Sequence, residues 1–569
     1  MAEVKWSRWQ LPVQYGLIAG VAVLYTALVG MMEVFRARAI ISGVLRLDQV
    51  LIFAPPLIAA LLVSRRSADA PSPLERLLMG AVVGLCASLP TVALLLLNTV
   101  VNVRQMFVSV SPTLVNLLTF EQELPAGIAL LIGSLVLFGI AGALLPLVPH
   151  RLRPSLIAAA TITLGLGLLS EVPIQIIRQS GGTAAVRTYF SANALRPATA
   201  LAIFVIVLLV FVLWQWQREN VRKRYNSLGV SGQYALKRTG LGLLFILLLA
   251  LPWIVGLFLS EVLVNVGIYV LMGLGLNIAV GLAGLLDLGY VTNFAVGAYV
   301  MGTLTSTGPL GIGQFNFWLI LPVSVLSAML TGFLLALPVL RMRGDYLAIA
   351  TLGFGEIIRL LALSDWLRPY IGGTQGMLFI PSAQIFGITL GGPQQIYYLI
   401  LGACFLTLFV MIRLNSSRTG RQWMALREDE DAAAAMGIDT IQTKVLAFTL
   451  SAAAGGLAGG IFATKLGAIF PHSFNLLISI NTLSIIIVGG MGSIPGIVLG
   501  ALALVGLPEL LREFAEYRLL MYGAALIAMM LLRPEGLWPS AVRRRELYEQ
   551  TASTVEETRA LTTPVAASD

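Results

Sequence analysis

The stretch ATALAIFVIVLLVFVLWQW, residues 198–216, contains no charged side chain. A helix needs roughly 20 apolar residues to cross a hydrocarbon core of about 30 Å. The run is apolar throughout and does not alternate with polar residues, so it predicts a helix and not a strand of a membrane barrel. A membrane-spanning helix is therefore the first expectation for this segment.

Runs of the same kind recur along the chain, which has 569 residues, 57% of them hydrophobic and only 11% charged. A soluble domain is about 25% charged. We therefore expect an all-α polytopic integral membrane protein with about 16 transmembrane helices, six of them N-terminal. The predicted N-terminal spans are 11–32, 48–64, 76–98, 125–147, 155–172 and 198–216. The predicted C-terminal spans are 240–259, 262–282, 289–306, 316–338, 346–363, 396–413, 444–466, 477–489, 496–511 and 517–533.

A strongly basic stretch, QRENVRKRYNSLGVSGQYALKRTG at residues 217–240, follows the opening run. Loops on the cytoplasmic side of a membrane carry an excess of Lys and Arg, so this stretch is predicted to be cytoplasmic. It divides the chain into a hydrophobic module (1–217), a basic linker (218–239) and a second hydrophobic module (240–540). Counting spans outward from the linker places the loop 413–444, a polar and disordered tail (541–569) and both termini in the cytoplasm.

Side chains that usually carry catalysis or bind metals are few and scattered. Cys86 and Cys404 lie inside apolar runs and are predicted to be unpaired, and His150 and His472 are isolated. The chain has no phosphate-binding G-x-x-x-x-G-K-[ST] loop, no GxSxG and no HExxH. We therefore predict a non-catalytic chain with no metal and no cofactor of its own. If ATP drives its function, another subunit must hydrolyse that ATP.

Polar residues inside the apolar runs are candidates for function. Glu356 lies in TLGFGEIIRLLAL, and Arg359 follows three residues later on the same face of the predicted helix. A charge within a span is costly, so it faces a partner or a cavity, and a structural ion pair and a functional site both remain open here. Asn277 and Asn293 are interpreted either as contacts between helices or as contacts to a polar solute.

The stretch GGMGSIPG, residues 489–496, interrupts an apolar run with Gly489, Gly490, Gly492 and Gly496. Such a sequence cannot sustain a helix and predicts a turn or an interrupted helix. Irregular backbone at membrane depth occurs only where protein or a water-filled cavity surrounds it.

The stretch REDEDAAAAMG, residues 427–437, places four acidic residues in a row beside a membrane. We interpret it as one helix whose acids favour the positive end of the helix dipole. Anionic headgroups would repel these acids, which argues against a helix lying on lipid. The small alanines instead suit a groove of a cytoplasmic partner. The candidate docking residues are Arg427, Glu428, Asp429, Glu430, Asp431, Ala432, Ala433 and Gly437.

Several of these stretches together resemble one family over about residues 267–538. They are GLNIAVGLAGLLDLGYVTNFAVGAY, RMRGDYLAIATLGFGEIIRLL, SRTGRQWMALREDEDAAAAMGI, GGMGSIPGIVLGA, LPELLREFAEYRLLMYG and LLRPEGLWP. The sequence is similar to the membrane permeases of ATP-binding-cassette importers for branched-chain amino acids, the M-type of the Liv system. Permeases of such importers carry a cytoplasmic E-A-A-x-x-x-G pattern that docks the ATPase. Residues 431–437 fit that pattern with Asp431 in the place of Glu.

The resemblance implies a ten-helix importer core and several partners. These are a homologous second permease, two ATP-binding-cassette subunits that bind ATP, an extracytoplasmic solute-binding protein and the lipid of the cell (inner) membrane. Members of the family often carry Thr-Gly-Gly-x-x-Gly after the Glu-bearing span. Here Ile371 replaces that threonine, and Thr374 follows as a candidate pathway residue. Nothing in the residues suggests nucleic acid as a partner.

The implied function is import of branched-chain or related neutral amino acids, which the binding protein delivers. Urea, amides and other small polar solutes remain open as cargo within the same importer class. A second hypothesis is an ion-coupled secondary transporter. A third is a protein that only interacts with other proteins and forms no transport pathway.

Overall fold

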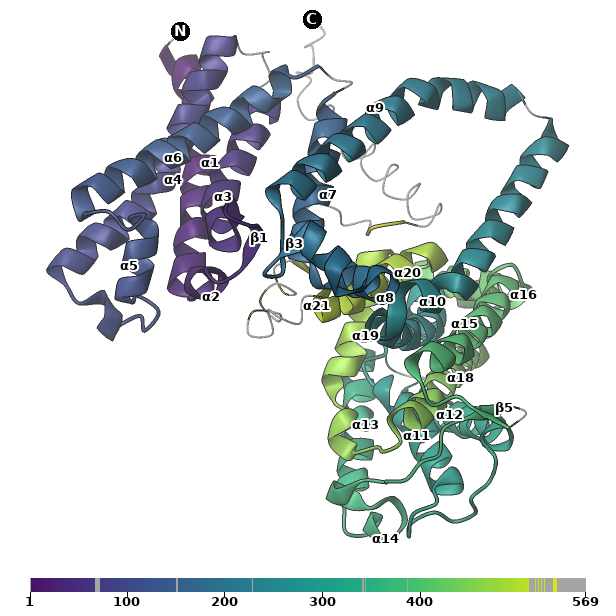
Figure 1. Ribbon diagram of the computed structural model, residues 1–569. Coiled ribbons are helices and arrows are strands. Elements are labelled where there is room, and N and C mark those ends of the chain that lie inside the picture. Colours follow the sequence, from purple (N-terminus) through teal and green to yellow (C-terminus); the bar gives the residue numbers. More distant parts are fainter. Residues whose placement is uncertain are drawn as a thin grey trace, which may run out of the picture. The chain divides into compact units, whose positions relative to one another are not determined.

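The computed structural model describes residues 2–66, 72–149, 152–227, 229–339, 342, 344–385, 387–510, 517, 520, 523, 526–527 and 536–539. The chain divides into two compact units, Met1–Leu244 and Phe245–Asp569. Both consist almost entirely of helices (Figure 1), which confirms the predicted all-α class. The predicted linker falls on the end of one helix, α9, and the start of the next, α10. The predicted tail, 541–569, lies outside the described residues.

The first unit contains nine helices and four short strands among its described residues. The helices are α1 (Ala2–Leu28), α2 (Met31–Phe35), α3 (Leu47–Arg66), α4 (Pro73–Val100), α5 (Pro112–Leu118), α6 (Leu124–Leu144), α7 (Arg153–Leu168), α8 (Glu171–Tyr189) and α9 (Pro197–Ser227). The strands are β1 (Ala39–Ile41), β2 (Leu45–Arg46), β3 (Phe190–Ser191) and β4 (Ala194–Leu195). The 3-10 turns are η1 (Val103–Gln105) and η2 (Leu145–Leu147).

Glycines let α4 and α6 pack backbone to backbone in the first unit. A Cβ on Gly84 would lie 2.4 Å from the Leu135 carbonyl oxygen, and one on Gly139 would lie 2.3 Å from that of Gly80. Lipid tails are as apolar as the helices, so close van der Waals contact of this kind is a main source of helix association in a membrane. A larger side chain at either position would force the two helices apart.

Two hairpins join the ends of these helices. Strands β1 and β2 pair with each other, β3 and β4 do the same, and β1 pairs with β4 through Ile41 and Leu195. The resulting sheet has the order β2-β1-β4-β3. It ties the turn between α2 and α3 to the turn between α8 and α9.

The second unit begins within α10 (Val230–Asn277). Its other helices are α11 (Val291–Thr305), α12 (Phe317–Val339), α13 (Asp345–Leu363), α14 (Arg368–Ile371), α15 (Pro393–Asn415), α16 (Arg418–Glu428), α17 (Glu430–Ala435), α18 (Thr440–Leu466), α19 (Leu476–Gly489), α20 (Ile494–Ala501) and α21 (Leu507–Leu510). Its π-turns are η3 (Ile278–Leu282) and η6 (Leu502–Gly506), its 3-10 turns are η4 (Gly373–Gln375) and η5 (Pro471–Ser473), and one hairpin joins β5 (Gln384–Ile385) to β6 (Ile388–Thr389).

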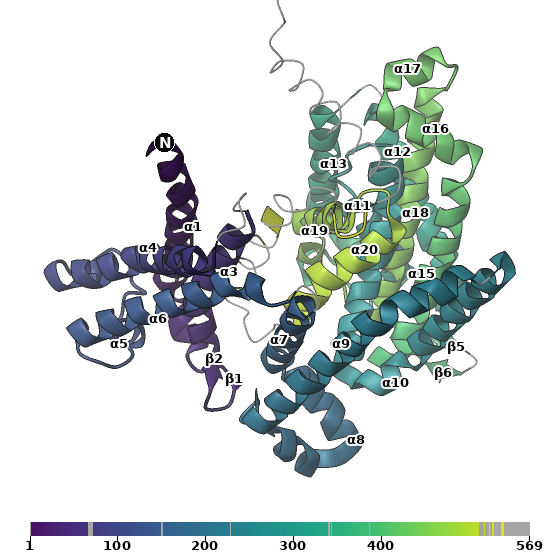
Figure 2. The ribbon, with the colours of Figure 1, turned by 90° about the horizontal axis from the view of Figure 1, so that it is seen from above.

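Helix α18 packs against α11 and α12 in the core of the second unit (Figures 1 and 2). A Cβ on Gly459 would lie 2.0 Å from the Phe294 carbonyl oxygen of α11, and one on Gly456 would lie 2.4 Å from Ala328 Cβ of α12. The small residues of α18 therefore serve tight helix packing at these two positions. They leave the polar residues of α11 close to the centre of the unit.

Helix α10 is broken at Gly256, whose φ is +80° and ψ is −177°. Before the break, Tyr398 Oη of α15 donates to the Leu249 carbonyl oxygen, and the ring of Phe245 lies 5.5 Å from that of Phe405. Before the break, residues further along α10 contact earlier residues of α15, from Phe405 to Tyr398. After the break, Gly267 lies again beside Ile400 and Cys404, so the chain reverses at Gly256. The predicted spans 240–259 and 262–282 are thus two arms that meet a few residues earlier than expected.

The predicted count of 16 spans is not confirmed. Among the described residues, 11 helices are long and apolar enough to cross a membrane, with α10 counted once, or 12 with the bent pair of α7 and the start of α8. That pair, near the predicted span 155–172, bends by 73°. Helix α11 has only 15 residues where a span 289–306 was expected, and Ile494–Leu510 is also short. The predicted span 517–533 lies mostly outside the described residues.

Candidate functional site

The acidic stretch 427–437 is not the single helix that its sequence predicts. Helix α16 ends at Glu428, Asp429 takes extended backbone angles, and α17 begins at Glu430. The Asp429 carboxylate accepts hydrogen bonds from the backbone N–H groups of Asp431, 2.8 Å, and Ala432, 2.9 Å. Asp is a favoured residue at this capping position, and its bonds satisfy N–H groups that a new helix start leaves without partners. We call residues 418–437 the α16–α17 segment.

Gly437 ends α17 at a φ of +84°. Its N–H donates to the Ala434 carbonyl oxygen, 3.0 Å, and the Ile438 N–H donates to that of Ala433, 3.1 Å. The left-handed conformation after a helix favours glycine because a Cβ there is strained. The glycine therefore turns the chain from α17 into α18.

The α16–α17 segment has an outer and an inner face. The outer face carries the exposed residues Glu428, Asp429, Asp431, Ala432, Ala434, Ala435 and Met436. Met436 is 83% exposed. The segment lies at one end of the second unit, joined to the ends of α15 and α18 (Figure 2). It offers acids, small alanines and one flexible apolar side chain together.

Two of the predicted docking residues point inward. Ala433 is buried, and Glu430 forms an ion pair with Lys444 Nζ of α18 at 2.6 Å. The Lys444 side chain is only 5% exposed, so Glu430 neutralises a buried cation. Trp423 is also buried, and its Nε1 donates to the Thr443 carbonyl oxygen, 2.9 Å. These contacts, which the sequence did not reveal, fix the segment to α18.

Arg427 joins the α16–α17 segment to the turn after α10. Its Nη1 donates to the Gly281 carbonyl oxygen of η3, 3.0 Å. Gly284 has a φ of +72°, and a Cβ on it would lie 2.6 Å from Arg427 Cγ. A second nitrogen of Arg427 pairs with Glu428, 3.0 Å. This hydrogen bond and the close approach at Gly284 link the α16–α17 segment to η3 and to the turn that follows it.

Asn277, the last residue of α10, holds the glycine-rich break. Its side chain is buried, and its Oδ1 accepts from the Gly492 N–H, 3.0 Å. Asn277 Nδ2 is buried and has no hydrogen-bond partner among the described residues. The structure therefore links two predicted site residues that lie far apart in sequence.

The glycine-rich stretch forms a tight turn between α19 and α20. Helix α19 ends at Gly489, Gly490 and Gly492 have φ values of +117° and +75°, and α20 begins at Ile494. A Cβ on Gly496 would lie 2.3 Å from the Gly489 carbonyl oxygen, so the two helices touch through their backbones. Trp538 covers the turn, and its backbone N–H donates to the same Gly489 carbonyl oxygen, 3.0 Å.

Polar groups of α11 and α13 surround a narrow cavity. The cavity has a volume of about 10 Å³, and Thr292, Tyr299 and Arg359 are among the residues that line it. This is room for about one water molecule, so an amino acid does not fit in this conformation. The Thr292 and Tyr299 hydroxyls, which belong to the lining, are buried with no hydrogen-bond partner among the described residues. Asn293 Oδ1 also has no partner there, but Asn293 lies outside the lining and packs beside Gly455 of α18.

Arg359 and Glu356 pair with each other at the edge of this cavity. Arg359 Nε lies 3.0 Å from both carboxylate oxygens of Glu356. The side chains are 28% and 44% exposed, respectively. The pair thus neutralises two charges within a span and leaves part of both open to a neighbour. Thr374 lies elsewhere, exposed on the short turn η4.

The sequence did not predict Thr292 and Tyr299 as candidate site residues. They lie seven residues apart on α11 and therefore on one face of that helix. The spacing was visible, but hydroxyl-bearing residues at such spacing are common helix contacts. Their lack of partners, which marks them, appears only in the folded chain.

The second unit matches a known family of membrane permeases. Residues 258–531 match the family model described as the branched-chain amino acid transport system permease component. The high-affinity branched-chain amino acid transport system permease protein LivM of Escherichia coli K12 is 40% identical over 333 residues, which cover 54% of this chain and 77% of that protein. The chain belongs to this family. The α16–α17 segment, the α11–α13 cavity and the glycine turn all lie within the matched region of the permease.

More distant relatives match a similar share of this chain, about half of it. The LivH permease protein of Salmonella typhimurium is 25% identical over 289 residues, 47% of this chain and 90% of its own. A probable LivM permease protein of Methanocaldococcus jannaschii is 23% identical over 333 residues, 49% of this chain and 93% of its own. No solved structure is significantly similar to the permease. Residues 1–257 precede the matched region, and the permease is a multi-pass membrane protein.

Proposed function

We propose that this chain forms the translocation pathway of an ATP-driven importer for branched-chain or related neutral amino acids. The names of its relatives support this cargo. One observation carries the proposal most directly: the exposed acidic and alanine face of the α16–α17 segment is anchored, through Arg427, to η3, the turn that follows α10. That arrangement suits a segment that a separate ATPase subunit moves when it binds ATP.

The proposed assembly contains a homologous second permease, two ATP-binding-cassette subunits and an extracytoplasmic solute-binding protein. Similarity to both LivM and LivH permeases supports the second permease subunit. ATP is bound and hydrolysed by the cassette subunits, so this chain is non-catalytic. The assembly lies in the cell (inner) membrane, with both termini of the chain and the α16–α17 segment in the cytoplasm.

In the proposed mechanism, ATP binding moves the α16–α17 segment as a rigid body. The buried Trp423 and the Glu430–Lys444 pair hold the segment to α18. Arg427 moves η3, and Asn277 at the start of η3 moves the glycine turn through Gly492. A π-turn and a glycine turn are irregular segments at which helices of a transporter can bend.

The cavity between α11 and α13 is the proposed point of solute passage. The buried hydroxyls of Thr292 and Tyr299, which have no partner among the described residues, offer hydrogen bonds to a zwitterion, and Arg359 can share its charge with a carboxylate. The apolar remainder of the lining, including Val291 and Phe474, suits an aliphatic side chain. The cavity must widen for this, as alternating access requires.

The experiment compares Arg427→Met with Arg421→Met in the complete importer. Arg427 donates to η3, whereas Arg421 is exposed on the same helix and, within the described part of the chain, donates only to the Ser416 carbonyl oxygen. Arg427→Met removes a charge-assisted bond but keeps most of the apolar stem. We expect ATP-driven leucine uptake to fall about tenfold, with ATPase copurification unchanged. Arg421→Met should leave both at the wild-type level.

Equal uptake by the two variants would contradict the proposed transmission. Uptake that persists without any ATPase subunit, and that follows an ion gradient, would replace the importer with a secondary transporter. Uptake of urea or an amide in preference to leucine would keep the mechanism and change the cargo.

A further inference from the structure

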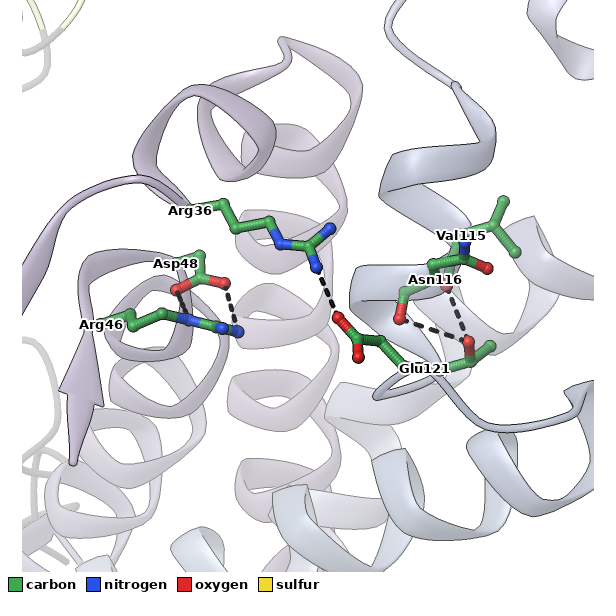
Figure 3. Close-up of polar contacts among 7 residues, drawn as sticks. Arg36, Arg46, Asp48, Val115, Asn116 and Glu121 are labelled. Atoms are coloured by element: carbon green, nitrogen blue, oxygen red, sulfur yellow. Dashed lines mark hydrogen bonds and ion pairs between the residues drawn. The ribbon is translucent and has the colours of Figure 1, made fainter. Parts of the chain in front are cut away.

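A polar cavity lies within the first unit, where the start of α3 faces the end of α5. It has a volume of about 210 Å³, far larger than the 10 Å³ of the cavity between α11 and α13. Four charged side chains line it, Arg36, Arg46, Asp48 and Glu121 (Figure 3). Two amides and an apolar wall complete the lining. The amides are those of Gln49 and Asn116.

One wall of the cavity is a buried carboxylate. The Asp48 side chain is 0% exposed, and its two oxygens accept from Nε and Nη2 of Arg46 at 3.2 and 3.1 Å. This paired geometry leaves Nη1 of Arg46 outside the ion pair. The Arg46 side chain is 43% exposed, so its guanidinium group faces both Asp48 and the open space.

The opposite wall carries the second ion pair, between Arg36 and Glu121 (Figure 3). Glu121 is 67% exposed, so one side of its carboxylate is open to a further donor. The cavity thus has one cation and one anion on each side, and its charges sum to zero. A solute with net charge would gain no net attraction, whereas one with both signs could bond at both sides.

The backbone that presents Glu121 is strained. Phe120 and Glu121 have φ values of +54° and +62°, a region that costs a residue with a Cβ about 1–2 kcal/mol. Two contacts hold them there. The Glu121 N–H donates to the Asn116 carbonyl oxygen, 2.7 Å, and the Phe120 ring stacks near Phe53 with centroids 6.3 Å apart. Strained residues held by their surroundings cluster at ligand-binding sites.

We propose that this cavity binds a compact zwitterion with an anionic group and a primary ammonium. The anionic group bonds to Arg46 and Arg36, and the ammonium bonds to Glu121, since guanidinium and carboxylate groups are the strongest partners for these charges. Ile52, Leu117 and Phe120 supply the apolar wall for a short substituent. Two sources carry this chemistry: a free neutral amino acid, and the headgroup of phosphatidylethanolamine. The inference concerns the first unit and does not rest on the proposed transport function.

The test uses the purified full-length chain and two binding arms. In one arm, equilibrium dialysis measures radiolabelled leucine and glycine. In the other, native mass spectrometry counts lipid retained from nanodiscs of phosphatidylethanolamine or phosphatidylcholine, because a choline group has no N–H to donate to Glu121. Saturable binding in either arm identifies the source.

Variants then tie the binding to the cavity. Glu121→Gln and Arg36→Gln remove one charge each, and Asn116→Trp fills the space without changing charge. We expect each to weaken binding about tenfold or more. Glu123→Gln is the matched control, since it removes an exposed carboxylate two residues from Glu121 and outside the lining. It should bind within about twofold of wild type.

Two results would overturn the proposal: no zwitterion binds in either arm, or the three cavity variants bind as well as Glu123→Gln. Size-exclusion profiles and thermal unfolding show whether each variant folds. Asn116→Trp leaves both ion pairs in place, so it still tests the cavity if a charge variant does not fold.

Discussion

Asp287 is a carboxylate buried between η3 and α11, outside the predicted spans. Its side chain is 3% exposed, and its Oδ1 accepts from the Gly289 N–H, 2.9 Å. Burial raises the pKa of Asp287 from 3.8 to about 7, and the bond from Gly289 offsets part of that rise. The desolvation of Asp287 depends on elements that pack around it and is invisible in the local sequence.

The raised pKa predicts that Asp287 destabilises the fold as pH rises. Below pH 3.8 the carboxyl is protonated in both the folded and the unfolded chain, so its ionisation does not affect the free energy of unfolding. As pH rises to about 7 the unfolded chain ionises and the folded chain does not, so the free energy of unfolding falls, and above about pH 7 the loss stays constant. At neutral pH it reaches on the order of 4 kcal/mol. Asp287→Asn keeps an oxygen for Gly289 and should raise the unfolding temperature at pH 8 but not at pH 4.

Thermal unfolding across this pH range measures the effect. Asp365→Asn is the control, because that side chain is 98% exposed. A stabilisation by Asp287→Asn that is equal at both pH values would refute the assignment to ionisation.

Glu356 and Arg359 are expected to depend on each other for stability. Glu356→Gln leaves an unpaired arginine within a span, which is costly, so the abundance of the chain in the membrane should fall. The double change Glu356→Gln with Arg359→Gln removes both charges and should restore abundance without restoring uptake. Immunoblots of membranes and leucine uptake separate the two effects. Equal abundance of the single and double variants would show that the pair is not coupled.

At the scale of elements, the α16–α17 segment shows what sequence can and cannot predict. The acidic run, the alanines and the glycine at its end are visible in the sequence, and so is a helical tendency. The break at Asp429 was missed, although Asp is a favoured cap, because alanine-rich sequence also fits an uninterrupted helix. Which alanine faces inward could not be predicted, since contact with α18 decides it.

The two faces predict opposite outcomes for neighbouring alanines. Ala434 is exposed, so Ala434→Trp should leave the chain abundant but reduce ATPase copurification and uptake to near background. Ala433 is buried, so Ala433→Trp should overpack the contact with α18 and cost about 1–3 kcal/mol or more, lowering abundance.

Abundance, copurification and uptake are measured on the same membranes. Ala435→Ser, a small change on the exposed face, serves as the control. Normal copurification by Ala434→Trp would show that the outer face does not dock the ATPase. The same result would remove the main support for the acidic docking surface.

At the scale of the whole molecule, apolar runs predict most spans because length and hydropathy alone decide whether a helix can cross lipid. They do not predict how such a helix bends. Gly182 inside α8 has a φ of +73°, and although the Gly181–Gly182 pair predicts a weak point in a helix, it does not predict which way the chain bends there. The polar cavity of the first unit was not predicted either, because Arg36 and Glu121 lie 85 positions apart in the sequence and meet only in the folded chain.

The charge pattern predicts that residues 227 and 436 lie on the same, cytoplasmic side. Both are exposed, so single cysteines can be placed at Ser227 and Met436 after Cys86 and Cys404 are replaced by alanine. A membrane-impermeant maleimide should label both in inverted vesicles and neither in intact cells. Labelling of one site from outside would require an odd number of crossings between them.

The reversal at Gly256 has a consequence for how the chain is made. The turn lies inside an uncharged stretch, residues 240–260, and the Ser260 hydroxyl closes it by donating to the Gly256 carbonyl oxygen, 2.7 Å. No hydrophilic loop separates the two arms, so no polar segment between them has to cross the bilayer in a separate step. We expect the arms to leave the ribosome and enter the lipid as one prefolded unit. The orientation of everything downstream is then set in a single biosynthetic event.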